Sequence, residues 1–300
     1  MQKSEQRIVF STVVRTTYER KQARMLAKSL RAFGGPLQDC PIWLFEADPK
    51  NVPCCSLAVD GVRVRTLKFP ESLRGGIFAE RVAGYAQAEE LAKGSVETLV
   101  CIDPGCLVVN PPLMYDLGAG FDVAVRPVHI RNIGSRLDEP LDPFWEKIYR
   151  TVELEDTSFQ VESYVDRQVL RAYFNSHSFC IKPSLGLLHQ WLGHYQDLFL
   201  DEAFQQTVCA DERHQIFLFQ AILSALLAKT IDPQRLRILP PSYNYPYNLH
   251  MNVPEDRRAG VLNELISITY EDRSLDPARM TDITVEDPLR TWLSERVPHV

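Results

Sequence analysis

The chain has 300 residues, of which 45% are hydrophobic and 24% charged, a composition typical of a globular protein with one large domain or two small ones. Its formal net charge of −6 argues against nucleic acid or an anionic membrane surface as the main partner, but is compatible with a small phosphate-bearing ligand. Seven cysteines without C-x-x-C or zinc-type spacing indicate reduced, mostly buried thiols. The sequence shows neither a secretory pattern nor an apolar stretch long enough to span a bilayer, so we expect a cytoplasmic protein without a transmembrane segment.

Apolar strands and amphipathic helices alternate through the first hundred residues. The pattern predicts strands over 8–14, 41–45 and 62–67, and helices over 18–33 and 78–92. This order, with short connections, predicts an α/β fold with a parallel sheet wrapped by helices. The turn after the first strand has neither G-x-G-x-x-G nor a Walker A lysine loop, which disfavours dinucleotide-binding and P-loop enzymes.

The chain is organised around residues 98–112. Residues 99–102 are a continuous apolar run, typical of a strand buried on both faces, and Asp103 follows at its carboxyl end. Asp103-Pro104-Gly105 breaks the strand, and apolar residues 107–109 resume pairing. Open α/β sheets bind ligands at the carboxyl ends of their strands, so Asp103 is a candidate ligand-binding residue.

The second half continues the alternation of strands and helices. It predicts strands over 121–125 and 173–181, a helix that begins at Pro143, and helices over 187–198 and 216–227. Residues 126–140 are predicted to form a loop.

Several of these segments resemble one known family. The run that ends in Asp103-Pro104-Gly105 resembles the strand and D-x-D element of GT-A-fold glycosyltransferases, especially the glycogenin-like retaining enzymes of glycosyltransferase family 8. The segment around Asn175-Ser176 resembles that family's aromatic-N-S-G strand, with His177 in place of the glycine. Residues 239–244 resemble its L-P-x-x-Y-N strand and residues 265–270 its I-x-H-Y/F strand, so the resemblance implies two further strands. The matches follow the family's order over residues 8–270. We therefore expect a GT-A-like domain over 1–270, with a mixed, mostly parallel sheet flanked by helices, and a C-terminal extension over 271–300.

The resemblance implies a site for a nucleotide diphosphate sugar, with uridine diphosphate as the expected carrier, and for an unidentified hydroxyl acceptor. It assigns Thr12 to Arg15 to the nucleotide base, Arg81 to the diphosphate, and the Asn175-Ser176-His177 segment to the sugar. An acid that opens a helix lies beside the reacting carbon in the family. Two registers remain open here: Asp211-Glu212 keeps the acid, whereas His214-Gln215 keeps the family's glutamine.

The resemblance also concerns a divalent cation, which the family binds through both D-x-D acids and a histidine. In this chain Gly105 occupies the position of the family's second acid, and Thr269 occupies the position of its histidine. Asp103 is therefore the one remaining protein ligand for the cation. We expect either no required cofactor or magnesium or manganese held weakly through Asp103. Cationic side chains could then face the diphosphate instead; the candidates are Arg81, Arg126, His129, Arg131, His177 and His214.

Two alternatives remain open from the sequence. The first is a degenerate, non-catalytic member that binds a nucleotide sugar or a protein, which the two missing metal ligands favour. The second is a nucleotidyltransferase, which the absence of a G-x-G-[ST]-R loop after the first strand disfavours.

Overall fold

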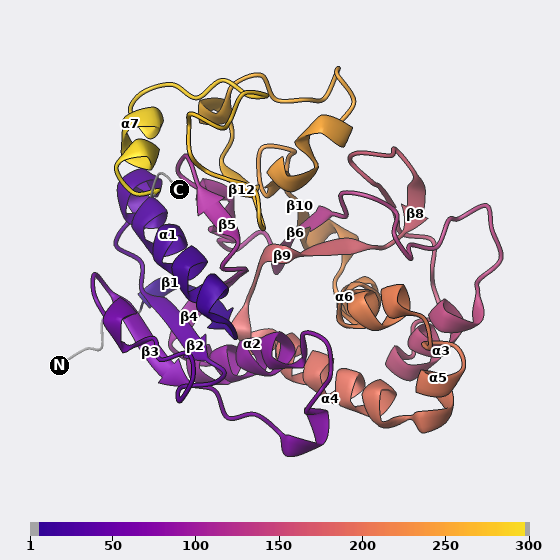
Figure 1. Ribbon diagram of the computed structural model, residues 1–300. Helices are drawn as coiled ribbons and strands as arrows, with labels where there is room; N and C mark the ends of the chain where they lie inside the picture. The colour runs from indigo at the N-terminus through magenta and orange to yellow at the C-terminus, as the bar shows by residue number, and fades with distance from the viewer. Residues whose placement is uncertain (1–5, 298–300) are drawn as a thin grey trace.

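The computed structural model describes residues 6–297, which fold around a seven-stranded sheet with helices on both faces (Figure 1). In spatial order the strands are β10 (Leu236–Ile238), β6 (Val123–Pro127), β9 (Phe174–Ile181), β4 (Val96–Ile102), β1 (Gln6–Val14), β2 (Ile42–Glu46) and β3 (Val62–Thr66). Strand β9 runs antiparallel to β4 and β6, and the other pairs are parallel. The expected mixed, mostly parallel sheet is confirmed.

Two helical layers cover this sheet. Helix α1 (Thr17–Phe33) packs on one face, and the other face carries α2 (Ala79–Ala92), α4 (Leu187–Leu200) and α6 (Glu212–Thr230). Helices α3 (Pro143–Val152) and α5 (Glu202–Gln206) pack against α6 and α4. Strand β4 alternates between the layers: Leu99 and Cys101 join the core under α2, α4 and α6, whereas Val100 and Ile102 join the core under α1. The prediction of a strand buried on both faces is thus confirmed.

A second, three-stranded sheet lies beyond the carboxyl end of β4. It consists of β11 (Tyr245–Pro246), β12 (Ser267–Thr269) and β5 (Cys106–Val108), and a separate hairpin pairs β7 (Gln160–Glu162) with β8 (Val169–Arg171). Leu275, Ile283 and Leu289, the last in helix α7 (Leu289–Ser294), share one buried cluster with Leu107 and Tyr245. Short 3₁₀ helices connect these elements at Gly35–Leu37, Cys55–Leu57, Glu71–Leu73, Leu113–Tyr115, Pro183–Leu185, Pro233–Arg235, Tyr247–Asn252 and Leu262–Glu264. Within residues 6–297 no helix is both long and apolar enough to cross a membrane.

The prediction of a strand over 239–244 is wrong, because this segment is the turn between β10 and β11. Pro240 and Pro241 have no N–H to donate to a ladder. Asn244 has a φ of 48°, in the left-handed region, which ends any extended pairing before Tyr245. The turn therefore delivers the Asn244 side chain to the interior, where it is fully buried.

Strand β9 is irregular where it passes the end of β4. Its register with β6 pairs Cys180 with Ala124 and Asn175 with Arg126, so β9 advances five residues (180 − 175) while β6 advances two (126 − 124). Such bulges change the direction in which neighbouring side chains point. The bulge lies between Asn175 and Cys180, beside the carboxyl end of β4.

Candidate functional site

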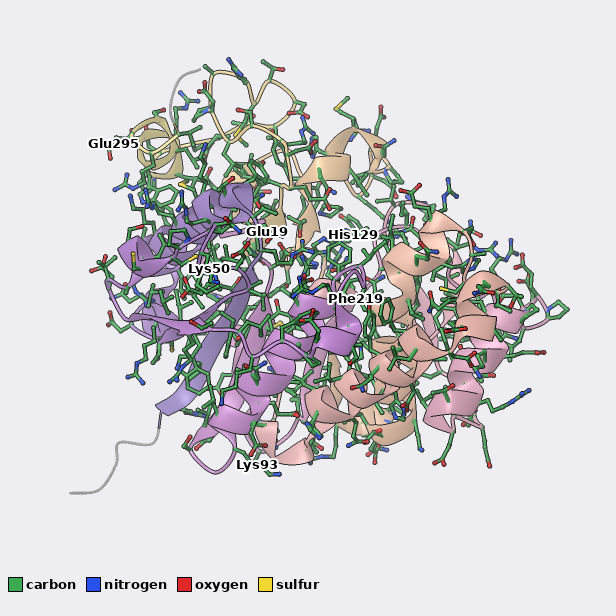
Figure 2. The ribbon with its side chains drawn as sticks, turned by 60° about the horizontal axis from the view of Figure 1, so that its bottom comes forward. Glu19, Lys50, Lys93, His129, Phe219 and Glu295 are labelled. Atoms are coloured by element: carbon green, nitrogen blue, oxygen red, sulfur yellow. The ribbon has the colours of Figure 1, made fainter. Side chains whose placement is uncertain are left out.

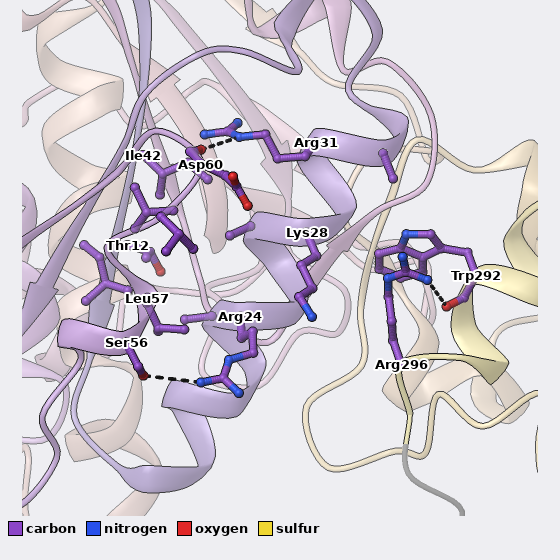
Figure 3. A pocket seen from close by; sticks show the side chains of 16 residues that line it. Thr12, Arg24, Lys28, Arg31, Ile42, Ser56, Leu57, Asp60, Trp292 and Arg296 are labelled. Carbon is purple, nitrogen blue, oxygen red and sulfur yellow. Dashed lines mark hydrogen bonds between the residues drawn. The ribbon is translucent and has the colours of Figure 1, made fainter.

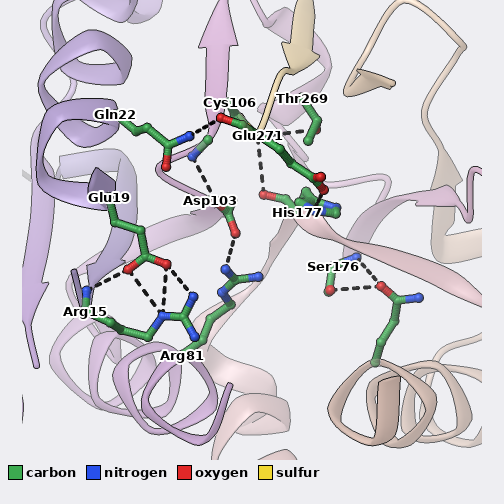
Figure 4. Close-up of polar contacts among 12 residues, drawn as sticks. Arg15, Glu19, Gln22, Arg81, Asp103, Cys106, Ser176, His177, Thr269 and Glu271 are labelled. Atoms are coloured by element: carbon green, nitrogen blue, oxygen red, sulfur yellow. Dashed lines mark hydrogen bonds and ion pairs between the residues drawn. The ribbon is translucent and has the colours of Figure 1, made fainter. Parts of the chain in front are cut away.

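A buried ion pair lies at the carboxyl end of β4. Arg81, in the first turn of α2, pairs through Nη2 with Oδ2 of Asp103, and the two residues are 5% and 7% exposed (Figure 4). Asp103 Oδ1 accepts a hydrogen bond of 2.8 Å from the Gly105 N–H. Burial has the largest single effect and raises the pKa of Asp103, but the Arg81 guanidinium, His177, the Gly105 N–H and Arg15 together hold that pKa below its usual value. Both side chains are therefore charged at neutral pH.

A second arginine approaches from the turn after β1. Arg15 forms a hydrogen-bonded ion pair with Glu19, which lies in the first turn of α1. The guanidinium carbons of Arg15 and Arg81 lie 4.7 and 4.6 Å from the centre of the Phe78 ring, so both cations contact one aromatic side chain. In Figure 2 the site lies near the centre of the view, where Glu19, His129 and Phe219 are labelled.

The environment of Gly105 leaves little room for a side chain at this position. A Cβ atom at this position would lie 3.3 Å from Asp103 Oδ1 and 3.3 Å from Gln22 Nε2, which is tighter than ordinary contact. Gln22 is held there by a 2.6 Å hydrogen bond from its Nε2 to the Glu271 carbonyl oxygen. Gln22 therefore occupies space next to Gly105 into which a side chain at this position would extend.

A network of amides and histidines lies next to this ion pair. Asn175 Oδ1 accepts hydrogen bonds from the His177 N–H at 2.8 Å and from Asn244 Nδ2 at 2.8 Å. His129 Nε2 lies 2.9 Å from the Asn244 carbonyl oxygen, and burial lowers the pKa of His129 well below its ordinary value, so the ring is neutral. The Thr269 hydroxyl donates a hydrogen bond to Asn244 Oδ1. Thr269 thus stabilises the turn before β11.

His177 joins the two groups of residues. Its carbonyl oxygen accepts a 2.7 Å hydrogen bond from the Asp103 N–H, and its Nε2 lies 3.4 Å from Glu271 Oε1. Asp103 and Asn175 both contact this one residue, although Asn175 lines the cavity beside it and Asp103 does not. A cavity of about 180 Å³ opens beside it, lined by Val128, His129, Ile130, Asn132, Asn175, His177, Phe217, Gln220, Asn248, Leu249 and Glu271.

The predicted sugar-binding residue Ser176 points toward α6. Its Oγ donates a 3.0 Å hydrogen bond to Gln220 Oε1, and its N–H donates a 3.3 Å bond to the same oxygen. Ser176 is 1% exposed and lies behind Gln220, which itself lines the cavity. Gln220 is thus the polar group that this part of the structure presents to a ligand.

The acids predicted to lie beside the sugar are at the start of α6. Asp211 is the N-cap, accepting hydrogen bonds from the N–H groups of Arg213 and His214, and it also pairs with the His214 ring. That ring packs 4.3 Å from the ring of Phe144. Neither Asp211, Glu212, His214 nor Gln215 lines the 180 Å³ cavity.

Distance along α6 explains this separation. Asp211 precedes Gln220 by nine residues, which corresponds to about 14 Å along the helix axis.

The predicted base-binding residues Thr12 and Arg15 face different surroundings. Thr12 is 1% exposed and lines a cavity of about 670 Å³ between α1 and the segment 56–62 (Figure 3), whereas Arg15 contacts Phe78. Of the other predicted cations, Arg131 pairs with Glu139, and Arg126 lines a separate cavity beside Tyr164. The structure thus brings Arg81, His129 and His177 together at the carboxyl end of β4.

The residues at this site do not fit a divalent cation held by protein ligands. Both carboxylate oxygens of Asp103 already have partners, Arg81 and the Gly105 N–H. Within the described part of the chain no three His, Cys, Asp or Glu side chains are grouped as metal ligands would be. Gly105 offers no side-chain oxygen, and the Thr269 hydroxyl is bonded to Asn244.

Four residues at the site were not identified from the sequence. Gln220 carried a signal, because it interrupts an otherwise apolar helix and a buried amide needs a partner. Asn244 ends the L-P-x-x-Y-N segment, which marked it without assigning it to the site, and Gln22 and Glu271 carried no signal, since each reaches the site through contacts between segments far apart in the chain.

No protein-family model matches the sequence, and no curated protein matches it. Solved structures do match. The chain aligns over 97% of its length with 97% of the galactosyltransferase LgtC, solved with donor and acceptor sugar analogs, at 14% identity and a TM-score of 0.50. An active-site mutant of LgtC aligns with the same coverage, at 14% identity and a TM-score of 0.51. The bifunctional glycosyltransferase WbbM in its apo form aligns over 90% of this chain and 46% of its own length, at 12% identity and a TM-score of 0.52. The fold of this chain is therefore that of the GT-A glycosyltransferases.

Proposed function

We propose that the protein transfers a sugar from a nucleotide diphosphate donor, expected to be a uridine diphosphate sugar, to a hydroxyl acceptor. The observation that carries this proposal is the buried Arg81–Asp103 pair at the carboxyl end of β4, where sheets of this class bind ligands. The fold, shared with LgtC and WbbM, supports it.

Donor binding is proposed not to require a metal. Transfer needs positive charge and hydrogen-bond donors at the leaving diphosphate. Arg81 carries five N–H groups, and arginine can engage phosphate oxygens in a bidentate manner. Because Asp103 balances the charge of Arg81, and Glu19 that of Arg15, we expect the protein to contribute directed hydrogen bonds more than net charge.

Binding of the transferred sugar is assigned to the 180 Å³ cavity. Gln220, Asn248 and the His177–Glu271 pair line it and offer amide, imidazole and carboxylate groups to sugar hydroxyls. The cavity is smaller than a typical ligand site, so we expect it to hold one sugar ring with the nucleotide outside it.

The role predicted from sequence for Asp211 or Glu212, beside the reacting carbon, stays a prediction. The N-cap geometry of Asp211 supports instead a role in stabilising α6.

Calorimetry with a panel of nucleotide sugars tests donor binding, with excess chelator and then with manganese. We expect binding that persists in chelator and that weakens in Arg81→Met. Arg74→Met is the matched control, because Arg74 pairs with Glu71 on the exposed loop before α2 and should leave affinity unchanged. Binding that strictly requires manganese would contradict the metal-free mechanism.

A nucleotide-release assay on the same donors tests for chemistry. Release of the nucleoside diphosphate, accelerated by added sugar acceptors, is the expected result. Donor binding with no release for any donor and acceptor would favour the non-catalytic alternative, and release of pyrophosphate from a nucleoside triphosphate would favour the nucleotidyltransferase.

A further inference from the structure

Arg126, on β6, is a buried cation without a counter-ion. It is 2% exposed, and its Nε and Nη2 atoms have no hydrogen-bond partner among residues 6–297. No carboxylate in the described part of the chain forms an ion pair with it; the titratable groups that act on it are the hydroxyls of Tyr164 and Tyr245. Its guanidinium lies 4.6 Å from the centre of the Tyr164 ring.

This arrangement is unusual, because buried charges in proteins are paired. Burial lowers the pKa of Arg126 to about 10, which still leaves the guanidinium protonated at neutral pH. A ligand with a negative charge would supply the counter-ion that the protein itself does not provide, and this would explain why Arg126 is both charged and buried.

Arg126 lines a cavity of about 530 Å³ at the β6–β10 edge of the main sheet. Much of its wall is apolar, formed by Pro127, Ile238, Leu239, Pro241 and the ring of Tyr164. The cavity is separate from the 180 Å³ one, because the two have no lining residue in common.

The remaining charges around this cavity are already balanced. Arg257 Nη2 lies 2.6 Å from Glu162 Oε1, and Asp256 pairs with Arg167. Arg126 therefore leaves one uncompensated positive charge. Glu162 and Asp256, both in the wall, would repel a second negative charge on a ligand.

We propose that this cavity is a binding site for a small organic monocarboxylate. The carboxylate accepts hydrogen bonds from the Arg126 guanidinium, and an apolar body packs against Tyr164, Ile238 and Leu239. The single available charge favours a monocarboxylate over a phosphate dianion. This site is independent of the proposed sugar transfer, and its test does not rely on that activity.

Benzoate is the probe, with benzamide as its neutral isostere and inorganic phosphate as the dianion. We expect benzoate to bind in calorimetry and to raise the thermal unfolding midpoint with concentration, with benzamide at least about tenfold weaker because it lacks the charge. Equal binding of benzamide, or preferential binding of phosphate, would overturn the assignment. Absence of benzoate binding would overturn it as well.

Arg126→Met tests the residue. Methionine retains apolar volume and removes an unpaired buried charge, so we expect the unliganded variant to unfold at the same temperature as the wild type or higher, and benzoate to have no effect on it. Arg237→Met is the control: Arg237 donates to the Met114 and Asp116 carbonyl oxygens and contacts Phe121, so its loss should lower stability and preserve the benzoate response. A benzoate response retained in Arg126→Met would refute the proposal.

Discussion

Removing Arg81 while keeping Asp103 should leave a buried carboxylate without its cation. The two side chains are 6% and 9% exposed, so little solvent is available to replace the lost partner. Breaking a buried pair in this way costs about 3–5 kcal/mol of unfolding free energy. For a chain of this length that corresponds to a thermal midpoint lower by about 5–8 °C. We expect this loss in Arg81→Met at neutral pH, measured by urea and thermal unfolding.

The pH dependence identifies the cause of this loss. In the wild type the pKa of Asp103 is held below its usual value, so the stability it contributes is present above the unfolded-state pKa and is lost as the pH falls through the folded-state pKa. In Arg81→Met burial is no longer opposed by Arg81, and the pKa of Asp103 rises. The deficit of the variant relative to wild type should therefore shrink as the pH falls from neutral and Asp103 of the variant becomes protonated.

Two further variants make this test specific. Arg81→Met combined with Asp103→Asn removes both charges and should be more stable than Arg81→Met alone at neutral pH. His177 acts electrostatically on Asp103, so the comparison is repeated with His177→Gln in every variant. A deficit that does not change with pH, or single losses that simply add in the double variant, would refute the uncompensated-carboxylate reasoning.

Three other predictions concern the same region. Gly105→Asp alone should lower stability and bind no manganese, whereas the double variant Gly105→Asp, Arg81→Met should bind manganese. Paramagnetic resonance measures manganese binding by the two proteins, and tight binding by Gly105→Asp alone would contradict the role of Arg81. Asp211→Ala should cost about 1 kcal/mol as a lost N-cap and retain sugar transfer; abolished transfer with intact donor binding would instead support the catalytic carboxylate predicted from sequence. Gln220→Leu should reduce transfer while the circular dichroism spectrum is preserved, and unchanged kinetics would remove Gln220 from the site.

The sheet could be predicted because its strands are short apolar runs with clear stops. The apolar run 99–102 predicted a strand buried on both faces, and in the structure this strand, β4, is longer and covers Val96–Ile102. The segment 239–244 was misjudged because its resemblance to a family strand was given more weight than its two prolines, which prevent ladder pairing. The hairpin of β7 and β8 was missed, since three-residue strands carry too few residues to show a period.

The site was predictable where it follows strand ends and not where it depends on tertiary contacts. Asp103 could be found because it ends an apolar strand, whereas Asn175 and Arg81 were identified through the family resemblance. Glu271 lies 94 residues (271 − 177) beyond His177, and no local pattern connects the two. The isolation of Arg126 was also beyond the sequence, because the absence of a counter-ion is a property of the packed structure.

The bulge in β9 has a consequence for how the site can be observed. The amides of Ser176 and His177 bond to side-chain oxygens of Gln220 and Asn175, where a regular strand would bond to its neighbours. A sugar hydroxyl that took either oxygen would compete with the backbone of the strand itself. Amide hydrogen exchange at these two positions therefore reports occupancy directly: the strand backbone acts as a built-in reporter, requiring neither label nor turnover.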